Sequence, residues 1–304
     1  MNKSFTLIEI LVVIVVVGII SAFILVGVSS ISNKANVAKS QAFVNSLDNA
    51  LLMSRISNWK LDENTNDSWG TNTGTWYGAG GGSNLSVNYK SSSDCVSNQC
   101  LDFDGTDDYV DYGDILRPSR NNNRTYSFWM NPRSVSGIIF GSGNMWQSAG
   151  GYSEFHVISS TEIQISYDIL NSPYRVTFNC PVDRLKWNYF TVSFDSISSS
   201  SNVTIKLYKN GSFISSSTQA RRTSAGYNIA FIIGAVNNDS DDHKIWFFNG
   251  QIDDFRVYDS LVSSQKIREN YFSGFNNLYE NKELTKIEYH KRIGELKSNL
   301  SNNE

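Results

Sequence analysis

The strongest pattern along the chain is an apolar run near its beginning. It extends from Ile10 to Val28 and is interrupted only by Gly18, Ser21 and Gly27. An uncharged stretch of this length predicts a membrane-spanning helix over about residues 9–29. Glu9 stands directly before the run, where a carboxylate at the edge of an apolar layer is costly. We therefore expect Glu9 to have a specific partner.

The helical pattern continues beyond the apolar run. Small and apolar residues recur at spacings of three and four from Ala35 to Leu51, and charged residues occupy other positions. No proline precedes Pro118, so nothing in the sequence forces a break. We expect one long helix from Phe5 to about Ile56 and assign residues 5–57 to it.

From Trp59 onward the hydrophobic pattern changes to a period of two, which is typical of strands. Clusters of Gly, Asn and Ser separate the alternating segments, and Asn210-Gly211 is a strong hairpin signal. The segments include residues 108–112, 126–130, 162–167, 175–178, 189–194, 203–208, 229–234 and 252–258. Short strands without intervening helices predict an antiparallel sandwich over residues 58–274.

The last segment, residues 275–304, has a third pattern. Apolar residues lie near helical spacing among alternating charges, and Glu288 stands four positions before Arg292. This pattern predicts a polar helix, and a solvated tail is the alternative. The expected fold class is therefore α+β, with a long N-terminal helix, an all-β antiparallel sandwich and a short C-terminal helix.

Composition and cysteine content narrow the function classes. The 304 residues carry a formal net charge of −3, so the chain lacks the basic surplus that favours nucleic-acid binding. Three scattered histidines and three cysteines do not form a zinc pattern. Outside the cytoplasm, Cys95 and Cys100 are expected to form a disulfide that closes a short loop. Cys180 is then unpaired, and we expect it to be buried among apolar side chains.

The segment Phe5-Thr6-Leu7-Ile8-Glu9 resembles the processing motif of type IV prepilins and pseudopilins. The resemblance implies a leader of residues 1–4, peptidase cleavage between Ser4 and Phe5, and N-methylation of Phe5. It also implies that Glu9 pairs with the N-terminal ammonium of a neighbouring subunit. The family usually has Gly where this chain has Ser4. An uncleaved anchor with Lys3 in the cytoplasm is the alternative.

Either interpretation places the rest of the chain outside the cytoplasm. The resemblance implies a single-pass inner-membrane protein that assembles with other pilin subunits into an extracellular pilus or a periplasmic pseudopilus. The implied processing partner is a prepilin peptidase and methyltransferase. Major pilin, minor pilin and secretion-system pseudopilin remain open.

A second resemblance covers roughly residues 58–272. Leu101–Val110, Tyr126–Met130, Trp187–Val192 and Gly250–Tyr258 resemble, in the right order, four strand motifs of laminin G-like, concanavalin A-like jelly rolls. This family includes lectin-like modules and glycoside hydrolases. Catalysis by such hydrolases needs paired carboxylates, and neither Glu154 nor Glu162 starts a paired motif. We therefore expect no enzyme activity.

The resemblance also implies a structural calcium ion, held by Asp253 with Asp62 or Asp104 as partners. Calcium prefers several hard oxygen ligands, but aspartates at strand ends also cap turns without a metal. Apart from this possible calcium, no cofactor is expected.

Several aromatic residues fall near Gly- or Asn-rich segments, where an exposed ring can stack on a sugar. They are Trp69, Trp76, Tyr77, Trp146, Tyr152, Trp246 and Phe247. We select Trp146 and Trp246 as the candidate ligand-binding residues. The sequence thus favours an adhesion head that binds a glycan or a cell surface, and a purely structural head without a ligand is the alternative.

Overall fold

The computed structural model divides the chain into two compact units, Met1–Met53 and Ser54–Glu304. The structure describes residues 7–8, 11–17, 54–78, 82–83, 88–116, 122–142, 153–167, 175–199, 201–221, 230–237 and 243–301. In the first unit, residues 7–8 and 11–17 are helical. Ser4, Phe5 and Glu9 lie outside the described residues. Among those described, no helix is both long enough and apolar enough to cross a membrane.

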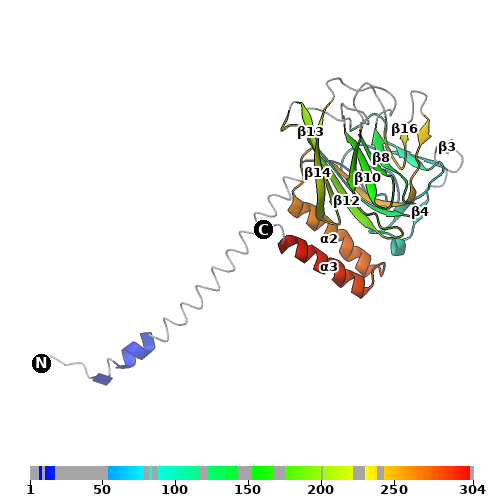
Figure 1. Cartoon of the computed structure of the whole chain (residues 1–304). Helices are drawn as coiled ribbons and strands as arrows, with labels where there is room; N and C mark the ends of the chain where they lie inside the picture. Colours follow the sequence, from blue (N-terminus) through cyan, green and yellow to red (C-terminus); the bar gives the residue numbers. More distant parts are fainter. Residues whose placement is uncertain are drawn as a thin grey trace. The chain divides into compact units, whose positions relative to one another are not determined.

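The second unit, which we call the head, is a sandwich of two antiparallel sheets (Figure 1). The first, sheet A, has the order β14-β13-β12-β7-β18-β5-β4, and β1 also pairs with β18. Its strands are β1 (Arg55–Trp59), β4 (Tyr89–Lys90), β5 (Cys100–Asp104), β7 (Arg124–Pro132), β12 (Asn188–Asp195), β13 (Asn202–Lys209), β14 (Ser212–Ala220) and β18 (Asn249–Tyr258). The closing strand β18 therefore lies at the centre of this sheet, between β7 and β5.

The second, sheet B, has the order β11-β10-β9-β8-β15-β6-β2-β3. Its strands are β2 (Thr75–Gly78), β3 (Gly82–Ser83), β6 (Tyr109–Asp111), β8 (Gly137–Ser142), β9 (Ser153–Val157), β10 (Glu162–Tyr167), β11 (Val176–Asn179) and β15 (Phe231–Ile233). A separate two-stranded ribbon consists of β16 (Val236–Asn237) and β17 (Lys244–Ile245). The predicted antiparallel sandwich is confirmed.

Alternating residues of both sheets fill the space between them. Phe128 and Phe255 of sheet A stack at 5.3 Å, and Phe128 meets Phe155 of sheet B edge to face at 5.1 Å. All three side chains are fully buried. Burial of each large apolar side chain stabilises the fold by about 1.5–3 kcal/mol. Cys180 belongs to this core, as predicted, and Cys95 and Cys100 form the predicted disulfide.

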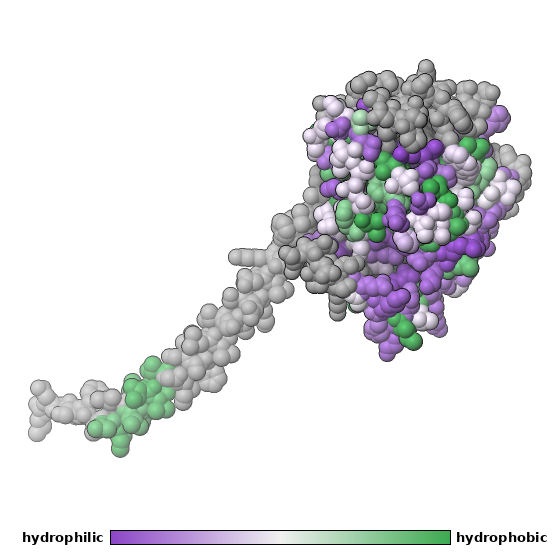
Figure 2. All heavy atoms as spheres, in the orientation of Figure 1, coloured by the Kyte–Doolittle hydropathy of each residue, from purple (hydrophilic) through white to green (hydrophobic). Residues whose placement is uncertain are grey.

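The C-terminal region differs from the predicted single helix over residues 275–304. Two helices occupy it, α2 (Ser264–Glu280) and α3 (Lys286–Ser301). The first begins inside the segment assigned to the sandwich, because its buried residues, including Tyr271 and Phe275, recur at helical spacing. The Tyr271 ring stacks on Trp129 of β7 at 5.5 Å, so α2 covers the outer face of sheet A. Figure 2 shows that the surface of the head on the side of α2 and α3 is mostly hydrophilic.

Gly274 fixes how closely α2 approaches the sheet. A Cβ atom at this position would lie 2.7 Å from the Trp129 side chain. The start of the head was also predicted slightly too late. Strand β1 begins at Arg55, inside the helix expected to extend to Ile56, because Arg55–Trp59 pairs with the closing strand β18. A long-range pairing of this kind has no signal in the local sequence pattern.

Candidate functional site

The outer face of sheet B carries the clearest cluster of polar and aromatic side chains. In β9, Phe155 points into the core, so Glu154 and His156 lie on the opposite, outer face. Glu154 pairs across the sheet with Gly141 of β8 and Ser166 of β10. Although it is on the outer face, its side chain is completely buried. Something must therefore cover it and satisfy its charge.

Arg175 satisfies that charge, and His156 lies beside the pair. The Arg175 side chain donates to both carboxylate oxygens of Glu154, at 3.2 Å to Oε1 and 3.1 Å to Oε2. The Nδ1 atom of His156 lies 3.3 Å from Oε1. A two-pronged arginine pair of this kind is among the strong charge-assisted contacts in proteins. Removal of one partner would leave the other as an uncompensated buried charge.

Trp246 covers the ion pair. Its ring stacks on His156 at 4.8 Å, and the guanidinium carbon of Arg175 lies 5.2 Å from the ring centroid. Beneath the ring, the side chains of Glu154 and His156 are buried and that of Arg175 is 18% exposed, whereas Trp246 is 39% exposed. Its exposed surface is therefore directed away from them. The backbone of Trp246 has φ 56°, which is unusual for a bulky residue, and its carbonyl accepts from the Ile138 amide at 2.8 Å.

The aromatic cluster continues across the sheet. Phe247 lies 6.4 Å from Tyr109 of β6, which stacks on Tyr77 of β2 at 4.8 Å. Tyr77 and Tyr109 are directly opposite in the β2–β6 ladder, on the face away from the core. We call Trp246, Phe247, Tyr109 and Tyr77 the aromatic row. Lys244 lies beside the row, with its ammonium nitrogen 5.2 Å from the Tyr109 ring centroid.

The structure separates the aromatic candidates of the sequence. Trp246 belongs to the row with Tyr77 and Phe247, whereas Trp76 is only 3% exposed and belongs to the core. Trp69 is 48% exposed and packs on Arg55, away from the row. Trp146 lies outside the described residues. The sequence reasoning missed the roles of Tyr109, His156 and Arg175, although the period of two places Glu154 and His156 on one face.

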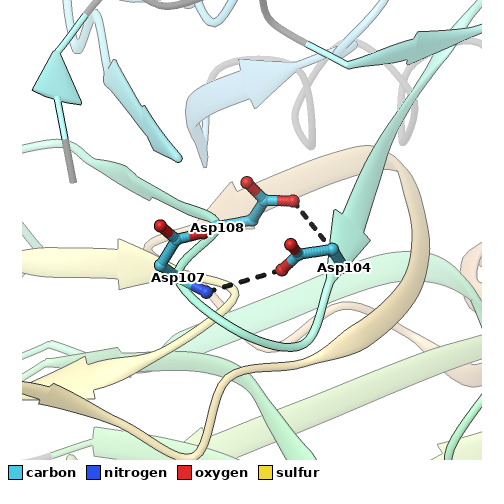
Figure 3. Close-up of side chains that lie close together, drawn as sticks. All are labelled: Asp104, Asp107 and Asp108. Carbon is cyan, nitrogen blue, oxygen red and sulfur yellow. Dashed lines mark hydrogen bonds between the residues drawn. The ribbon is translucent and has the colours of Figure 1, made fainter. Parts of the chain in front are cut away.

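A group of three carboxylates lies on the turn between β5 and β6 (Figure 3). Oxygen atoms of Asp104, Asp107 and Asp108 lie within 4.8 Å of one another, so the group could hold a metal ion. Asp104 Oδ1 accepts from the Thr106 amide at 2.7 Å, and Asp108 Oδ2 accepts from the Asp104 amide at 2.8 Å. Burial raises the pKa of Asp108 to about 6, and the charges of its aspartate neighbours act in the same direction.

This turn fits calcium in the chemistry of its donors, because carboxylate oxygens from nearby positions are hard ligands. Asp253 and Asp62, the other predicted calcium ligands, are not part of this group of carboxylates. Asp253 is fully buried, and its Oδ2 accepts from the amides of Val96 and Ser97, each at 2.9 Å. Burial raises the pKa of Asp253 well above its usual range. This side chain fixes the disulfide-closed loop to the closing strand.

Asp62 holds the same loop from the other side. Its carboxylate accepts from the Gln99 amide at 3.3 Å and from the Asn98 side chain at 3.1 Å. It lines a pocket of about 410 Å³ together with other carboxylate and amide side chains, including Glu63 and Asn64. One oxygen of Asp253, Oδ1, is buried without a hydrogen-bond partner. The structure thus divides the predicted calcium ligands between two places, the turn at Asp104 and the loop at Asp253.

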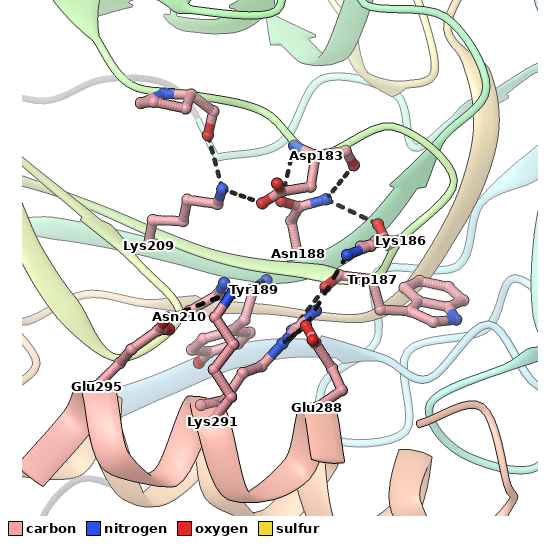
Figure 4. A network of polar contacts seen from close by, with 12 residues as sticks. Asp183, Lys186, Trp187, Asn188, Tyr189, Lys209, Asn210, Glu288, Lys291 and Glu295 are labelled. Atoms are coloured by element: carbon pink, nitrogen blue, oxygen red, sulfur yellow. Dashed lines mark hydrogen bonds and ion pairs between the residues drawn. The ribbon is translucent and has the colours of Figure 1, made fainter. Parts of the chain in front are cut away.

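A polar network lies on the sheet A side of the head, where α3 meets the β12–β13 region (Figure 4). Arg292 is 7% exposed and donates to Glu288 Oε1 at 3.0 Å and to the Trp187 carbonyl at 3.3 Å. Lys209 donates to Asp183 and to the Pro181 carbonyl, both at 2.6 Å. The side chains surround a pocket of about 290 Å³. The lysine and arginine side chains that line this pocket already contact carboxylate or carbonyl oxygens. The network therefore serves to fix α3.

Comparison with known proteins supports the assignment of both units. Residues 1–25 match the model of the prokaryotic N-terminal methylation motif. Domain 4 of an extracellular arabinanase from Geobacillus stearothermophilus, solved with arabinotriose, has 17% identity and a TM-score of 0.52. This match covers 71% of the present chain and 97% of that domain. No curated protein sequence matches the chain.

Two toxin domains share the same fold. The binding domain of botulinum neurotoxin serotype D has 16% identity and a TM-score of 0.53, and that of Paraclostridial Mosquitocidal Protein 1 has 14% and 0.54. Each match covers 74% of this chain but only 52% and 53% of the toxin domains. Residues 104–268 match the family model of the concanavalin A-like lectins and glucanases, more than half of the chain. The N-terminal motif is a separate feature of the same chain. Through the residues of its sandwich, the chain belongs to the concanavalin A-like lectin/glucanase superfamily.

Proposed function

We propose that this protein is a pilin-like filament subunit whose head binds a glycan. The methylation motif supports the first half, since it implies peptidase processing and assembly with other pilin subunits. Cleavage would fall between Ser4 and Phe5, and Glu9 would pair with the new N-terminus of a neighbour. Mass spectrometry of protein sheared from cells tests this half. N-methylated Phe5 is the expected N-terminus, and surface-located protein that retains Met1 would contradict it.

One observation carries the second half of the proposal, namely the position of Trp246. Its ring is partly exposed above a buried ion pair, beside the other rings of the aromatic row. Aromatic faces of this kind bind the apolar faces of sugar rings, and fixed polar groups beside them set orientation. The ion pair beneath holds the ring in place before a ligand arrives, which lowers the entropy lost on binding. The arabinotriose complex of the similar arabinanase domain adds support by analogy.

The matched test compares two exposed tryptophans. The full chain in detergent micelles is screened on a glycan array, and arabinotriose is the first soluble probe. Replacement Trp246→Ala is expected to weaken binding at least tenfold, or about 1.4 kcal/mol. Trp69→Ala is the control, because Trp69 has similar exposure but packs on Arg55 away from the row. Equal binding by both variants would contradict the role of Trp246, and no bound glycan would favour the purely structural head.

We also propose that the head has no glycosidase activity. Hydrolysis needs two carboxyl groups that flank the scissile bond, one as acid and one as base or nucleophile. Glu154, the carboxylate beneath the aromatic row, already pairs with Arg175 through both of its oxygens. A reducing-sugar assay on the bound glycan tests this proposal. Sugar release that disappears in the Glu154→Gln variant would overturn it.

A further inference from the structure

The disulfide-closed loop, residues 95–100, covers part of the outer face of sheet A. Asp253 of β18 is directly opposite Trp129 of β7, and Trp129 lies on the outer face beneath α2. The side chains of directly opposite residues share a face, so Asp253 also points outward. It is nevertheless fully buried, and its Oδ2 accepts from the loop amides of Val96 and Ser97. The loop therefore closes over this carboxylate.

Other elements of the head hold the rest of the loop. Asp62, which follows β1, accepts from the Gln99 amide and from the Asn98 side chain. Asn281, at the C-terminal end of α2, donates its side-chain N–H to the Cys95 carbonyl at 3.3 Å. The loop thus connects the closing strand β18, the segment after β1 and the end of α2.

The two carboxylates at this loop do not fit a calcium ion. Calcium takes about six to eight oxygen ligands. Among the described residues, the hydrogen-bond partners of Asp253 and Asp62 are all N–H groups, which direct partial positive charge at the carboxylates. Oδ1 of Asp253 has no hydrogen-bond partner, but one oxygen is far fewer than the ion needs. Burial also raises the pKa of Asp253 well above its usual range, which favours the uncharged acid.

We infer that in this chain the disulfide-closed loop takes the place of the calcium ion that the family resemblance implies at Asp253. The loop amides supply the positive charge that an ion would supply there. The disulfide restricts the conformations of the loop and so holds its amides near the carboxylate. An ion stabilises only in proportion to its concentration, whereas a loop of the same chain is always present. The closing strand therefore depends on the disulfide and not on calcium at this place.

Asparagine at position 253 separates a hydrogen-bond acceptor from a calcium ligand. It keeps one oxygen that accepts from N–H groups but loses the negative charge. Melting temperatures of the full chain in detergent micelles are measured with calcium and with a chelator. Any stabilisation by calcium should be the same in Asp253→Asn as in the wild type, and Asp107→Asn measures the part that is due to the acidic turn. A calcium effect that disappears in Asp253→Asn and persists in Asp107→Asn would overturn the inference.

Removal of the disulfide gives a second readout, namely hydrogen exchange of the loop amides followed by mass spectrometry. The variant with both Cys95→Ala and Cys100→Ala is expected to exchange these amides about tenfold faster or more, and calcium should not restore their protection. Cys180→Ala, which removes a buried cysteine outside the disulfide, is the control and should leave the loop protected. Unchanged protection without the disulfide, or its recovery in calcium, would contradict the inference. The asparagine comparison decides the question even if the variant without the disulfide does not fold.

Discussion

Replacement of Asp253 by alanine tests the connection between the closing strand and the disulfide-closed loop. The carboxylate is fully buried and accepts from the amides of Val96 and Ser97. Alanine removes Oδ2, the one oxygen that accepts from both amides. Val96 is 1% exposed, so its N–H would be left without a partner, and Ser97, which is less buried, can be reached by water. A buried unsatisfied donor costs about 1–3 kcal/mol, so we expect a total loss of roughly 2–4 kcal/mol.

Asparagine at the same position keeps one acceptor oxygen. We therefore expect Asp253→Asn to lose only about 1 kcal/mol in the free energy of unfolding. Urea denaturation of the head, residues 54–304, measures both values, and Asp259→Ala serves as the exposed control with a change below about 0.5 kcal/mol. If Asp253→Ala were as stable as the wild type, or if asparagine were as damaging as alanine, the capping role assigned to this carboxylate would be wrong.

Three further predictions concern the acidic turn and α3. If the turn binds calcium, the ion will raise the melting temperature by mass action, a chelator will reverse this, and Asp107→Asn will reduce the shift. The raised pKa of Asp108 means that the folded state binds its proton more tightly than the unfolded state. Stability should therefore fall as pH rises from about 4 to about 6, and Asp108→Asn should flatten this part of a pH series of urea melts. Arg292→Ala should speed hydrogen exchange in α3 more than the exposed Lys291→Ala does, and equal protection in both variants would contradict the anchoring role of Arg292.

Local signals in the sequence were sufficient for the features that depend on nearby residues. The Cys95–Cys100 pair closes a short loop, and the Asn210-Gly211 hairpin connects adjacent strands β13 and β14. The period of two separates inward from outward residues without knowledge of the strand order. These features need no long-range information, so a single sequence predicts them.

Features that depend on distant partners were harder to predict. Asp253 was assigned to calcium because its type and position match a family pattern, but its amide partners lie more than 150 positions earlier. The first residues of β1, Arg55 to Ser57, were read as helix because their partner, β18, comes near the end of the chain. Tyr109 and Arg175 were missed for the same reason. Tyr109 contacts Phe247, and Arg175 contacts Trp246, only because the segment after β17 folds back over sheet B.

The two outer faces of the sandwich have different coverings, and this difference determines where a ligand can bind. On sheet A, α2 packs Tyr271 against Trp129, and Gly274 lets the helix approach closely, so that face is closed by the chain itself. On sheet B, the segment after β17 carries Trp246 and Phe247 over the sheet, and the ring of Trp246 remains partly exposed. A closed face stabilises the head, whereas a partly exposed aromatic face above a fixed ion pair can exchange contacts with water for contacts with a ligand. The proposed binding face is therefore that of sheet B.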